Sequence, residues 1–431
     1  MRIVIIGGGI SGLFTAIMCK TRIPGSKITL IEKESRLGGR VFTKKYIDGS
    51  SFESGAGRFG MKHNILIALL KRYKLDRDII PISNTISQKL GPLLKSEEYR
   101  GVSPEEILYN LSKDTRLTRE DYKTNTIETL VRRLYGDDAA RKVVHQFEYD
   151  SEIQIARAQT SLRSILNTFR GEFGVLKGGL SRLINEMIGE LSGSKSGVTI
   201  MKGTECTSIE REDDGSYTLK LKTGAGVGGL LGMMGLENVL RANKVIVCTP
   251  RAQAHSLLQG LIGEEQADNL YGSQIIQDEP LIRVYARFPK NWIDTKIVSR
   301  KAIRYIIPVS NDPPIVMISY TDGPIARIWS NFRKQVGDRE TVQELLRQLR
   351  GMFPKKSIPD PIWVSFEEHP VGASYWKPSI EDVTSKKMKK MRQNPLPNVY
   401  VCGEFLSMYH QAWVEGALET SLGVVRSIQS G

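Results

Sequence analysis

The feature that most constrains the fold is a glycine-rich turn between an apolar run and a helical stretch at the start of the chain. In MRIVIIGGGISG, Ile3 to Ile6 form an uninterrupted β-branched run, which is typical of a strand buried on both faces. Gly7-x-Gly9-x-x-Gly12 follows at once, and a mostly apolar stretch without proline comes next, as suits a buried helix. In such a unit Gly7 permits the tight turn, Gly9 lets the backbone approach a pyrophosphate, and Gly12 lets helix and strand pack closely. The turn therefore predicts a helix N-terminus that binds phosphate groups.

An acidic residue stands where a nucleotide ribose needs an acceptor. A second apolar run, Lys27 to Ile31, ends in Glu32, which lies 20 residues after Gly12 (32 − 12 = 20). A carboxylate at this strand end can accept hydrogen bonds from both ribose hydroxyls. The spacing predicts a βαβ dinucleotide-binding unit. By itself it does not separate NAD from FAD, and a glycine-rich turn without a ligand stays open as the alternative.

The continuation of the sequence helps to distinguish the two cofactors. Glu34-Ser35-Arg36-Leu37-Gly38-Gly39-Arg40 resembles the second dinucleotide signature of the flavin amine oxidase superfamily, which includes monoamine and polyamine oxidases, L-amino-acid oxidases, protoporphyrinogen oxidase and carotenoid desaturases. The resemblance implies FAD as the cofactor, with Gly39, Arg40 and, less directly, Arg36 extending the pyrophosphate cradle. It also implies an α/β fold: a Rossmann-like, glutathione-reductase-like FAD domain with two dinucleotide-binding signatures and an inserted mixed α+β substrate domain.

Further anchors of the resemblance run to the end of the chain. The segment Leu176 to Leu183 is similar to the family's glycine pair before a helix, and Val198 to Ile209 is similar to the strand whose backbone holds the adenine. Cys206 takes the place usually held by valine there, an exchange that a backbone contact tolerates. Near the C-terminus the resemblance implies that Glu404, after Gly403, binds the ribityl chain. It also implies that the start of the last helix faces the flavin ring, through Trp413, Val414 and Ala417.

These anchors imply a division of the chain into two domains. The FAD-binding domain is expected to comprise residues 1–61, 174–250 and 392–431, and the substrate-binding domain residues 62–173 and 251–391. The glycine-rich, apolar stretch 224–235 is not a phosphate loop, because no Gly-Lys-Ser/Thr follows it. We expect it to be a flexible insertion between two hairpin strands.

Two stretches depart from the family pattern. Leu281 to Pro289 resembles the strand that, in most amine and amino-acid oxidases, carries a lysine that assists reoxidation by oxygen, and Arg283 stands at its position. Arginine is not an equivalent replacement, so rapid reaction with oxygen is in doubt; the alternative is that Arg283 is an ordinary residue at a strand end.

Gly372 to Trp376 resembles the stretch where monoamine oxidases attach the flavin to cysteine. This stretch contains no cysteine, so FAD is expected to bind noncovalently. Tyr375 and Trp376 are candidates for an aromatic wall over the flavin, with core packing as the alternative.

The stretch FESGAGRFG points to the substrate. Together with Lys62-His63-Asn64 it resembles the L-amino-acid oxidase pattern, in which an arginine clasps the substrate carboxylate. This implies that Arg58 binds a carboxylate through its planar fork, with Gly57 beside the flavin. The alternative is that Arg58 braces the cofactor and the loop.

The resemblance implies an FAD-dependent oxidase that converts a C–N bond of an amine or L-amino acid to the imine. Oxygen is the expected acceptor and hydrogen peroxide the product. The residues expected to act at the reacting centre are Arg58, Arg283, Trp376 and Trp413. Two alternatives stay open: a flavin desaturase or porphyrinogen-type oxidase, and an FAD-stabilised structural or interaction protein with little turnover.

Composition excludes several other classes. The 431 residues contain 61 basic and 47 acidic side chains, but the surplus is scattered, and the densest run, Lys386 to Lys390 with Arg392, has no interleaved aromatic residue. Nucleic-acid binding is therefore not favoured. The four cysteines and five histidines show no metal-ligand spacing. No stretch approaches the roughly 20 apolar residues of a membrane span. We expect an intracellular, cytoplasmic protein, associated with the virion if the source is a virus, whose oligomeric state the sequence leaves open.

Overall fold

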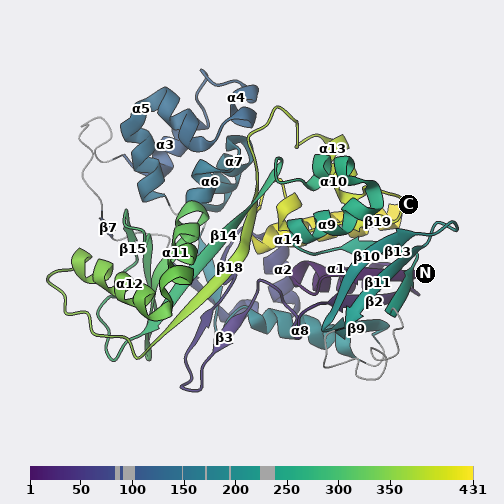
Figure 1. The fold of residues 1–431 in the computed structure, drawn as a ribbon, viewed down its shortest axis with the longest axis horizontal. Helices are drawn as coiled ribbons and strands as arrows, with labels where there is room; N and C mark the ends of the chain where they lie inside the picture. The colour runs from purple at the N-terminus through teal and green to yellow at the C-terminus, as the bar shows by residue number, and fades with distance from the viewer. Residues whose placement is uncertain are drawn as a thin grey trace.

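The structure is a computed structural model that describes residues 1–82, 88–90, 102–147, 149–169, 172–193, 196–223 and 238–430. Its fold is mixed α/β, as the sequence predicts, with a parallel sheet at one end and a larger mixed sheet beside it (Figure 1). The finer division into a glutathione-reductase-like domain and an inserted domain, with the boundaries given above, stays a prediction. The glycine-rich stretch 224–235 lies outside the described residues.

The N-terminal half of the dinucleotide motif lies at the centre of a parallel sheet. Its five described strands run in the order β19-β13-β1-β2-β9, and Ile3 of β1 pairs with Ile28 on one side and Lys244 on the other. A central strand of this kind is covered on both faces, which explains the uninterrupted β-branched run. The strands are β1 (Arg2–Ile6), β2 (Lys27–Glu32), β9 (Val198–Lys202), β13 (Lys244–Val247) and β19 (Val399–Val401).

Helices cover one face of this sheet and a small antiparallel sheet covers the other. On the helical face Leu13, Ile17, Leu418 and Val424 are buried in one core with Ile3 and Ile5. The helices there are α1 (Ile10–Arg22), α2 (Asn64–Arg72), α8 (Ser181–Ser192) and α14 (Val414–Ser430). The opposite face packs against β10 (Thr204–Arg211), β11 (Tyr217–Thr223), β12 (Asn238–Ala242), α9 (Arg251–Ile262) and α10 (Glu264–Tyr271).

The second block is built on a mixed sheet whose described strands run in the order β18-β14-β17-β16-β15-β7. Two of these strands are long and cross the molecule diagonally in Figure 1, so that their ends reach the parallel-sheet unit. The strands are β7 (Gln88–Leu90), β14 (Ile276–Arg287), β15 (Ile297–Ser299), β16 (Tyr305–Asn311), β17 (Pro314–Asp322) and β18 (Trp363–Trp376). Helices α11 (Gly323–Val336) and α12 (Asp338–Met352) share a core with this sheet.

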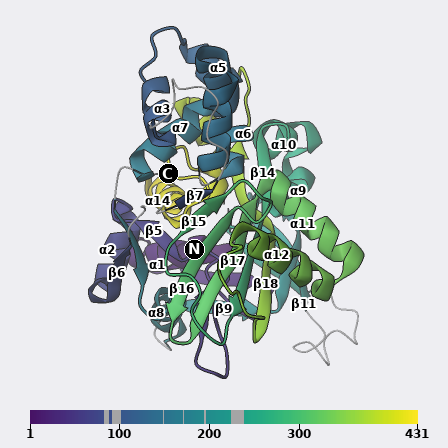
Figure 2. The same cartoon turned by 90° about the vertical axis from the view of Figure 1, so that its left-hand side faces the viewer.

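A cluster of helices stands at one end of the molecule, above the mixed sheet in Figures 1 and 2. The cluster has its own apolar core, which includes Leu108, Leu130, Val143 and Leu162. It consists of α3 (Pro104–Leu111), α4 (Arg119–Thr124), α5 (Ile127–Gln146), α6 (Asp150–Gln154) and α7 (Ala158–Phe169).

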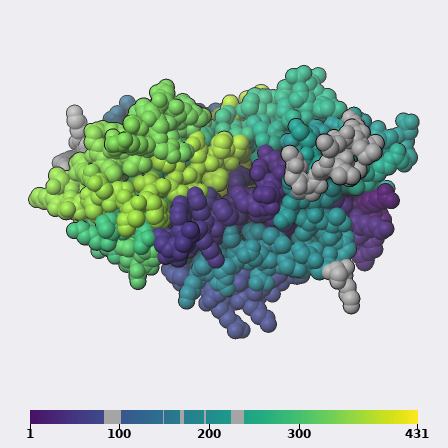
Figure 3. All heavy atoms as spheres, turned by 60° about the horizontal axis from the view of Figure 1, so that its bottom comes forward, coloured from purple at the N-terminus to yellow at the C-terminus, as the bar shows by residue number. Residues whose placement is uncertain are grey.

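Short strands connect the two blocks. On the face shown in Figure 3, purple atoms of the N-terminal part of the chain lie between green atoms on one side and teal atoms on the other. This part of the chain contributes β3 (Thr43–Lys45) and β4 (Ser51–Glu53), and then β5 (Arg58–Gly60), which pairs with β8 (Phe173–Leu176). The remaining elements are β6 (Ile79–Ile82), α13 (Lys386–Gln393) and the 3-10 turns Asp76–Asp78 and Glu404–Leu406.

Candidate functional site

Each of the three glycines of the first turn is required for a different structural reason. Gly7 has φ +105°, and a Cβ there would lie 2.9 Å from the carbonyl oxygen of Cys248. A Cβ at Gly12 would lie only 1.9 Å from the carbonyl oxygen of Gly7. Both positions therefore demand glycine for the fold itself. Gly9 has φ −69°, and the nearest described atom to a Cβ there is the Cα of Gly39 at 4.0 Å. The protein leaves the space over Gly9 open, which suits the close approach of a pyrophosphate.

The start of α1 is prepared for an anion. Gly9 is its N-cap residue, no described side chain caps it, and its first turn contains no acidic residue. The first N–H groups of a helix have no intrahelical partner and carry the positive end of the helix dipole. Gly38 lies beside this turn, since its N–H donates to the carbonyl of Gly8 at 2.9 Å. The two glycine segments thus form one cradle, and the residues present fit a dinucleotide pyrophosphate.

The predicted ribose acceptor lies at the edge of this cradle. Glu32 ends β2 and is 8% exposed. Its Oε2 accepts the N–H of Gly8 at 2.7 Å, and its Oε1 accepts the N–H of Glu34 at 2.9 Å. A carboxylate offers about four lone-pair positions, so Glu32 can accept further hydrogen bonds from a ribose. Its role with the ribose stays a prediction.

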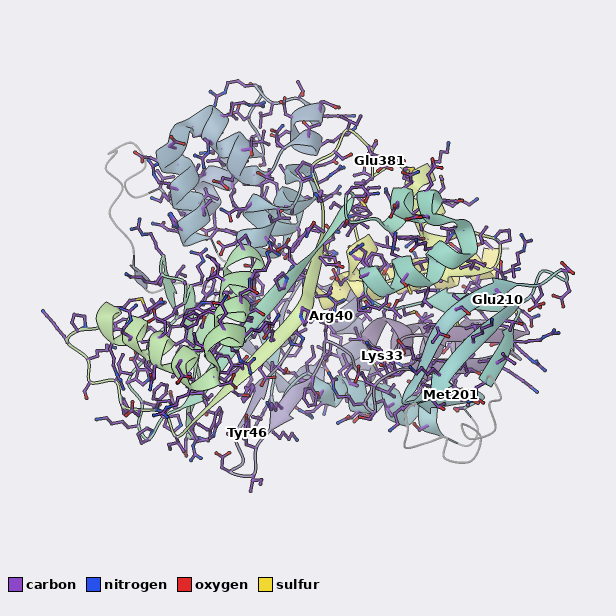
Figure 4. All side chains as sticks on the ribbon, in the orientation of Figure 1. Lys33, Arg40, Tyr46, Met201, Glu210 and Glu381 are labelled. Carbon is purple, nitrogen blue, oxygen red and sulfur yellow. The ribbon has the colours of Figure 1, made fainter. Side chains whose placement is uncertain are left out.

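The two arginines of the second signature have separate surroundings. Arg36 is exposed, and its guanidinium lies 4.4 Å over the ring of Phe42. Arg40 pairs with Glu404, with 2.9 Å between Nη1 and Oε1, and also donates to the carbonyl of Gly372 at 3.1 Å. Figure 4 shows Arg40 beside the long strand β18, where the two blocks meet. The structure therefore brings together Arg40 and Glu404, two residues that the sequence places in the cofactor site from opposite ends of the chain.

The glycines of FESGAGRFG hold this loop against the second signature. A Cβ at Gly55 would lie 1.9 Å from the carbonyl oxygen of Arg40, and the N–H of Ala56 donates to that oxygen at 2.9 Å. A Cβ at Gly57 would lie 2.2 Å from Cγ of Glu53. The close approach of two backbone segments explains Gly55, and packing on Glu53 explains Gly57. Together these contacts fix the position of the backbone at Arg58.

Arg58 lies in an aromatic enclosure. It is the first residue of β5, and its Nη2 donates to the hydroxyl of Tyr149 at 2.6 Å. Its Cζ lies 4.5 Å from the ring centre of Phe173, 5.8 Å from Tyr149 and 5.9 Å from Trp413. The structure thus brings the predicted residues Arg58 and Trp413 together. It adds Tyr149 and Phe173, which the sequence did not indicate.

Arg283 holds the loop that carries Arg58. It lies within β14 and not at the strand's end, and its Nη1 donates to the carbonyls of Gly55 and, at 3.3 Å, of Glu53. Its guanidinium also lies 4.7 Å over the ring of Tyr320, which meets Tyr149 edge to face at 5.8 Å. The guanidinium of Arg283, at the position where the family pattern has a lysine, is therefore bound to backbone carbonyls.

The start of α14 joins the same site from the C-terminal side. Trp413 comes immediately before the helix, Val414 begins it, and Ala417 is buried. Glu415 accepts the N–H groups of Ile65 and Leu66 at 2.9 Å each, so it caps α2 from a distance. The sequence analysis missed Glu415, although it names the neighbouring residues Val414 and Ala417.

His63 is a second residue of the site, which the sequence analysis names only as part of the Lys62-His63-Asn64 pattern and without a role of its own. Its ring meets Trp413 at 5.2 Å and His410 at 5.4 Å, and its Nδ1 accepts the N–H of Gly60 at 3.3 Å. His63 is 2% exposed. Burial, with a smaller effect of His410, lowers the pKa of His63 to about 3. The imidazole is therefore neutral at physiological pH, with its proton on Nε2.

This burial has a consequence for stability at acidic pH. His63 resists protonation in the folded chain, whereas in the unfolded chain it takes up a proton below its ordinary pKa of about 6.5. Stability that is present above that pH is thus lost as the pH falls toward 3, by at most about 1.4 kcal/mol per pH unit. We expect His63→Phe to remove this part of the slope in urea unfolding measured at several pH values. Equal slopes for the variant and the parent would contradict the assignment.

Three other predicted residues are buried and make no described contact with Arg58. Trp376 is 1% exposed in the core on the β10–β12 side of the parallel sheet, and its Nε1 donates to the carbonyl of Ser407 at 3.0 Å. This position favours the core-packing alternative. Tyr375 is 5% exposed and lines a small pocket with Glu152 and Tyr409. Cys206 is buried in β10, consistent with a position where only the backbone is offered to a ligand.

The described residues contain neither a candidate metal cluster nor a candidate membrane span. No three or more His, Cys, Asp or Glu side chains in the described ranges are grouped so that they could hold a metal ion. None of the helices in the described part of the chain is both long and apolar enough to cross a bilayer.

Comparisons with known proteins identify relatives along the whole chain. The profile of the flavin-containing amine oxidoreductases matches residues 10–429. The flavin-dependent L-tryptophan oxidase RebO of Lentzea aerocolonigenes is 22% identical, over 100% of this chain and 98% of its own length. The coproporphyrinogen III oxidase of Bacillus subtilis (strain 168) is 24% identical, over 63% of this chain and 65% of its own length. A crystal structure from Exiguobacterium sp. 255-15, provisionally assigned as a protoporphyrinogen oxidase, has a TM-score of 0.71 at 18% identity, covering 100% of this chain and 98% of that one.

Proposed function

This chain belongs to the family of flavin-containing amine oxidoreductases, and we propose that it oxidises the C–N bond of an L-amino acid or related amine to the imine. It is an oxidoreductase, and its cofactor is FAD. When bound, FAD accepts a hydride equivalent from the carbon that carries the nitrogen. The observation that supports an amino acid as substrate is Arg58, a guanidinium enclosed by aromatic rings next to Trp413 at the start of α14.

The chain's own residues would hold the cofactor at three places. The cradle at Gly9 and Gly38 and the start of α1 would bind the pyrophosphate through backbone N–H groups. Glu32 would accept the ribose hydroxyls. The start of α14 would present N–H groups and a positive dipole to the flavin ring, where negative charge is favoured.

Arg58 would orient the substrate by its carboxylate. A carboxylate is a stronger acceptor for a guanidinium than the neutral hydroxyl of Tyr149, and it can take two parallel hydrogen bonds from the fork. The rings of Phe173 and Trp413 lie beside the half-buried guanidinium and would limit its access to water, and an ion pair is stronger where water is excluded. Fixing the carboxylate would place the neighbouring carbon and nitrogen in one orientation.

Oxygen is the proposed acceptor, with hydrogen peroxide as the product. Arg283 is bound to the carbonyls of Glu53 and Gly55. Its guanidinium keeps the Arg58 loop in place. Because this arginine stands where most amine oxidases are expected to have a lysine that assists reoxidation, the reduction of the flavin and its reoxidation by air are to be measured as separate steps.

The experiment that tests the proposal is a stopped-flow screen of flavin reduction without oxygen. L-amino acids, monoamines and polyamines are each mixed with the yellow protein, and air is then readmitted. Reduction by L-amino acids supports the proposal. Reduction by polyamines or monoamines alone would assign a different substrate class, and no reduction by any of these compounds at any concentration would refute C–N oxidation.

A porphyrinogen-type oxidase is the second candidate. One relative is named coproporphyrinogen III oxidase, and a substrate with carboxylate side chains would also suit Arg58. Coproporphyrinogen belongs in the same screen, because its oxidation yields a fluorescent porphyrin. Porphyrin formation that exceeds the spontaneous rate, together with inert amino acids, would favour this candidate.

The flavin is expected to be held without a covalent bond. The stretch Gly372 to Trp376 contains no cysteine, and the four cysteines of the chain, at 19, 206, 248 and 402, are all buried. Acid precipitation of the purified protein should therefore release the yellow colour into the supernatant. Colour that stays with the pellet after extensive washing would show a covalent link.

A further inference from the structure

Two cysteines lie side by side beneath the dinucleotide turn. Cys248 and Cys402 each follow the last residue of a strand, and those last residues, Val247 of β13 and Val401 of β19, pair in parallel register. The register continues one step further, since the N–H of Cys402 donates to the carbonyl of Val247 at 3.0 Å. The two Sγ atoms are 3.4 Å apart. The backbone therefore holds both sulfurs on the same face of the sheet.

The backbone spacing also suits a covalent link. Neighbouring strands lie about 4.7–4.9 Å apart, and disulfides span Cα–Cα distances of about 4.4–6.8 Å. The sulfurs would need to approach from 3.4 Å to about 2.05 Å, which rotation of the two side chains can supply. Register neighbours on adjacent strands thus fall within the Cα–Cα range of a disulfide.

Hydroxyl groups surround one of the two sulfurs. The Oγ atoms of Ser11 and Ser421 lie 3.5 and 3.6 Å from Sγ of Cys402, and Oγ1 of Thr15 lies at 3.7 Å. These groups come from α1 and α14, so the pocket around the sulfur is polar although it is buried. Hydrogen bonds from Cys248 and from these hydroxyls lower the pKa of Cys402, against the opposite effect of burial. Burial raises the pKa of Cys248 well above its ordinary value.

The other two cysteines have a different environment. Burial raises the pKa of Cys19 and of Cys206 to about 12 in each case. A thiolate is the reactive form of cysteine, so Cys19 and Cys206 are internal controls of the same residue type in the same chain.

We propose that Cys248 and Cys402 are a redox-active dithiol, which a peroxide converts into a cross-strand disulfide. The sulfur of Cys402 attacks one peroxide oxygen, the O–O bond breaks, and a sulfenic acid and the first water form. The sulfur of Cys248 then attacks the sulfur of Cys402, the S–O bond breaks, and the disulfide and a second water form. The two thiols lose two electrons and two protons, and one hydrogen peroxide is reduced to two waters. The proposed function supplies a source of the peroxide, but the modification itself does not depend on it.

Peptide mapping of the intact FAD-bound protein tests this inference. Reduced protein is treated with hydrogen peroxide in the absence of any amine or amino acid, alkylated after denaturation, and digested without reductant. We expect the number of titratable thiols to fall from four to two, with a peptide that joins Cys248 to Cys402, and dithiothreitol to restore all four. Four surviving thiols, or oxidation without this linkage, would overturn the proposal. Because peroxide is added, the result is independent of whether the chain oxidises amino acids.

Variants separate the pair from the remaining thiols. Cys19→Ala and Cys206→Ala are expected to leave the linkage unchanged. Cys248→Ala should abolish it, and the sulfenic acid at Cys402 should then be trapped by dimedone. If Cys248→Ala does not fold, the mapping of the parent protein still decides the question. A linkage to Cys19 or Cys206, or dimedone labelling at either of them in preference to Cys402, would contradict the assignment.

Discussion

Replacing Arg58 with leucine is expected to raise KM for L-amino acids about 10- to 150-fold and to leave KM for amines without a carboxylate nearly unchanged. The factor corresponds to about 1.5–3 kcal/mol for the loss of a hydrogen bond to a charged group. The aromatic rings of Phe173 and Trp413 lie beside the guanidinium and would shield the carboxylate contact from water, so the loss should be larger than at a fully exposed site. Steady-state kinetics with an L-amino acid and with its decarboxylated amine measure the difference.

Two further variants make this result specific. Arg58→Lys keeps the charge but loses the planar fork, so an intermediate effect is expected. Arg133→Leu removes an arginine of the helical cluster whose side chain is 46% exposed and pairs with Asp121, and it should leave both constants unchanged. An equal rise in KM for amino acids and amines in Arg58→Leu would show that the arginine braces the loop and does not bind a carboxylate.

The second large effect is expected at Gly9. Gly9→Ala should weaken FAD binding by about 5- to 150-fold, because a methyl group in a close contact costs about 1–3 kcal/mol. The apoprotein should fold normally, since the nearest described atom to the new Cβ is 4.0 Å away. Flavin fluorescence titration gives the dissociation constant, and thermal unfolding of the apoprotein gives the stability.

Substitutions at two other glycines serve as controls for that experiment. Gly12→Ala would place a Cβ 1.9 Å from the carbonyl oxygen of Gly7, so it should lower both the stability of the apoprotein and FAD binding. Gly189→Ala lies in α8 with no described atom within 4 Å of the new Cβ, and it should leave FAD binding unchanged. Unchanged FAD affinity in Gly9→Ala would show that the pyrophosphate does not lie over this turn.

The parts of the site that sequence patterns predict are those built from local backbone chemistry. The strand, the turn and the helix from Arg2 to Arg22 follow from the hydrophobic run and the glycine spacing, because Gly7 and Gly12 avoid backbone contacts within this unit or with the neighbouring strand, and Gly9 leaves space for a ligand. The meeting of Arg40 with Glu404 was not predicted as a pair, but each was indicated by its own motif.

Residues brought in by tertiary pairing could not be predicted in this way. Tyr149 and Phe173 reach Arg58 because β5 pairs with β8 and the helical cluster lies alongside, and neither residue stands in a motif. The contact between Cys248 and Cys402 depends on the register of β13 against β19. Such contacts depend on how separate segments align in space, which local spacing does not encode.

The aromatic residues at the end of β18 illustrate a different difficulty. Tyr375 and Trp376 are neighbours in sequence, and successive side chains of a strand point to opposite faces. Trp376 therefore enters the core beneath the parallel sheet, while Tyr375 lines the pocket beside Glu152. The sequence shows two large aromatic residues near an expected flavin, but it does not show which of them faces inward.

The most direct test of the account is the rate of flavin reduction without oxygen by matched pairs of compounds, each an L-amino acid and the amine that its decarboxylation gives. The account predicts that at least one L-amino acid bleaches the flavin at a rate that saturates with concentration. Its decarboxylated amine should require a far higher concentration, and Arg58→Leu should remove most of the difference between the two. A flavin that no L-amino acid reduces at any concentration, or one that the amine of every pair reduces as readily as the amino acid, would contradict it.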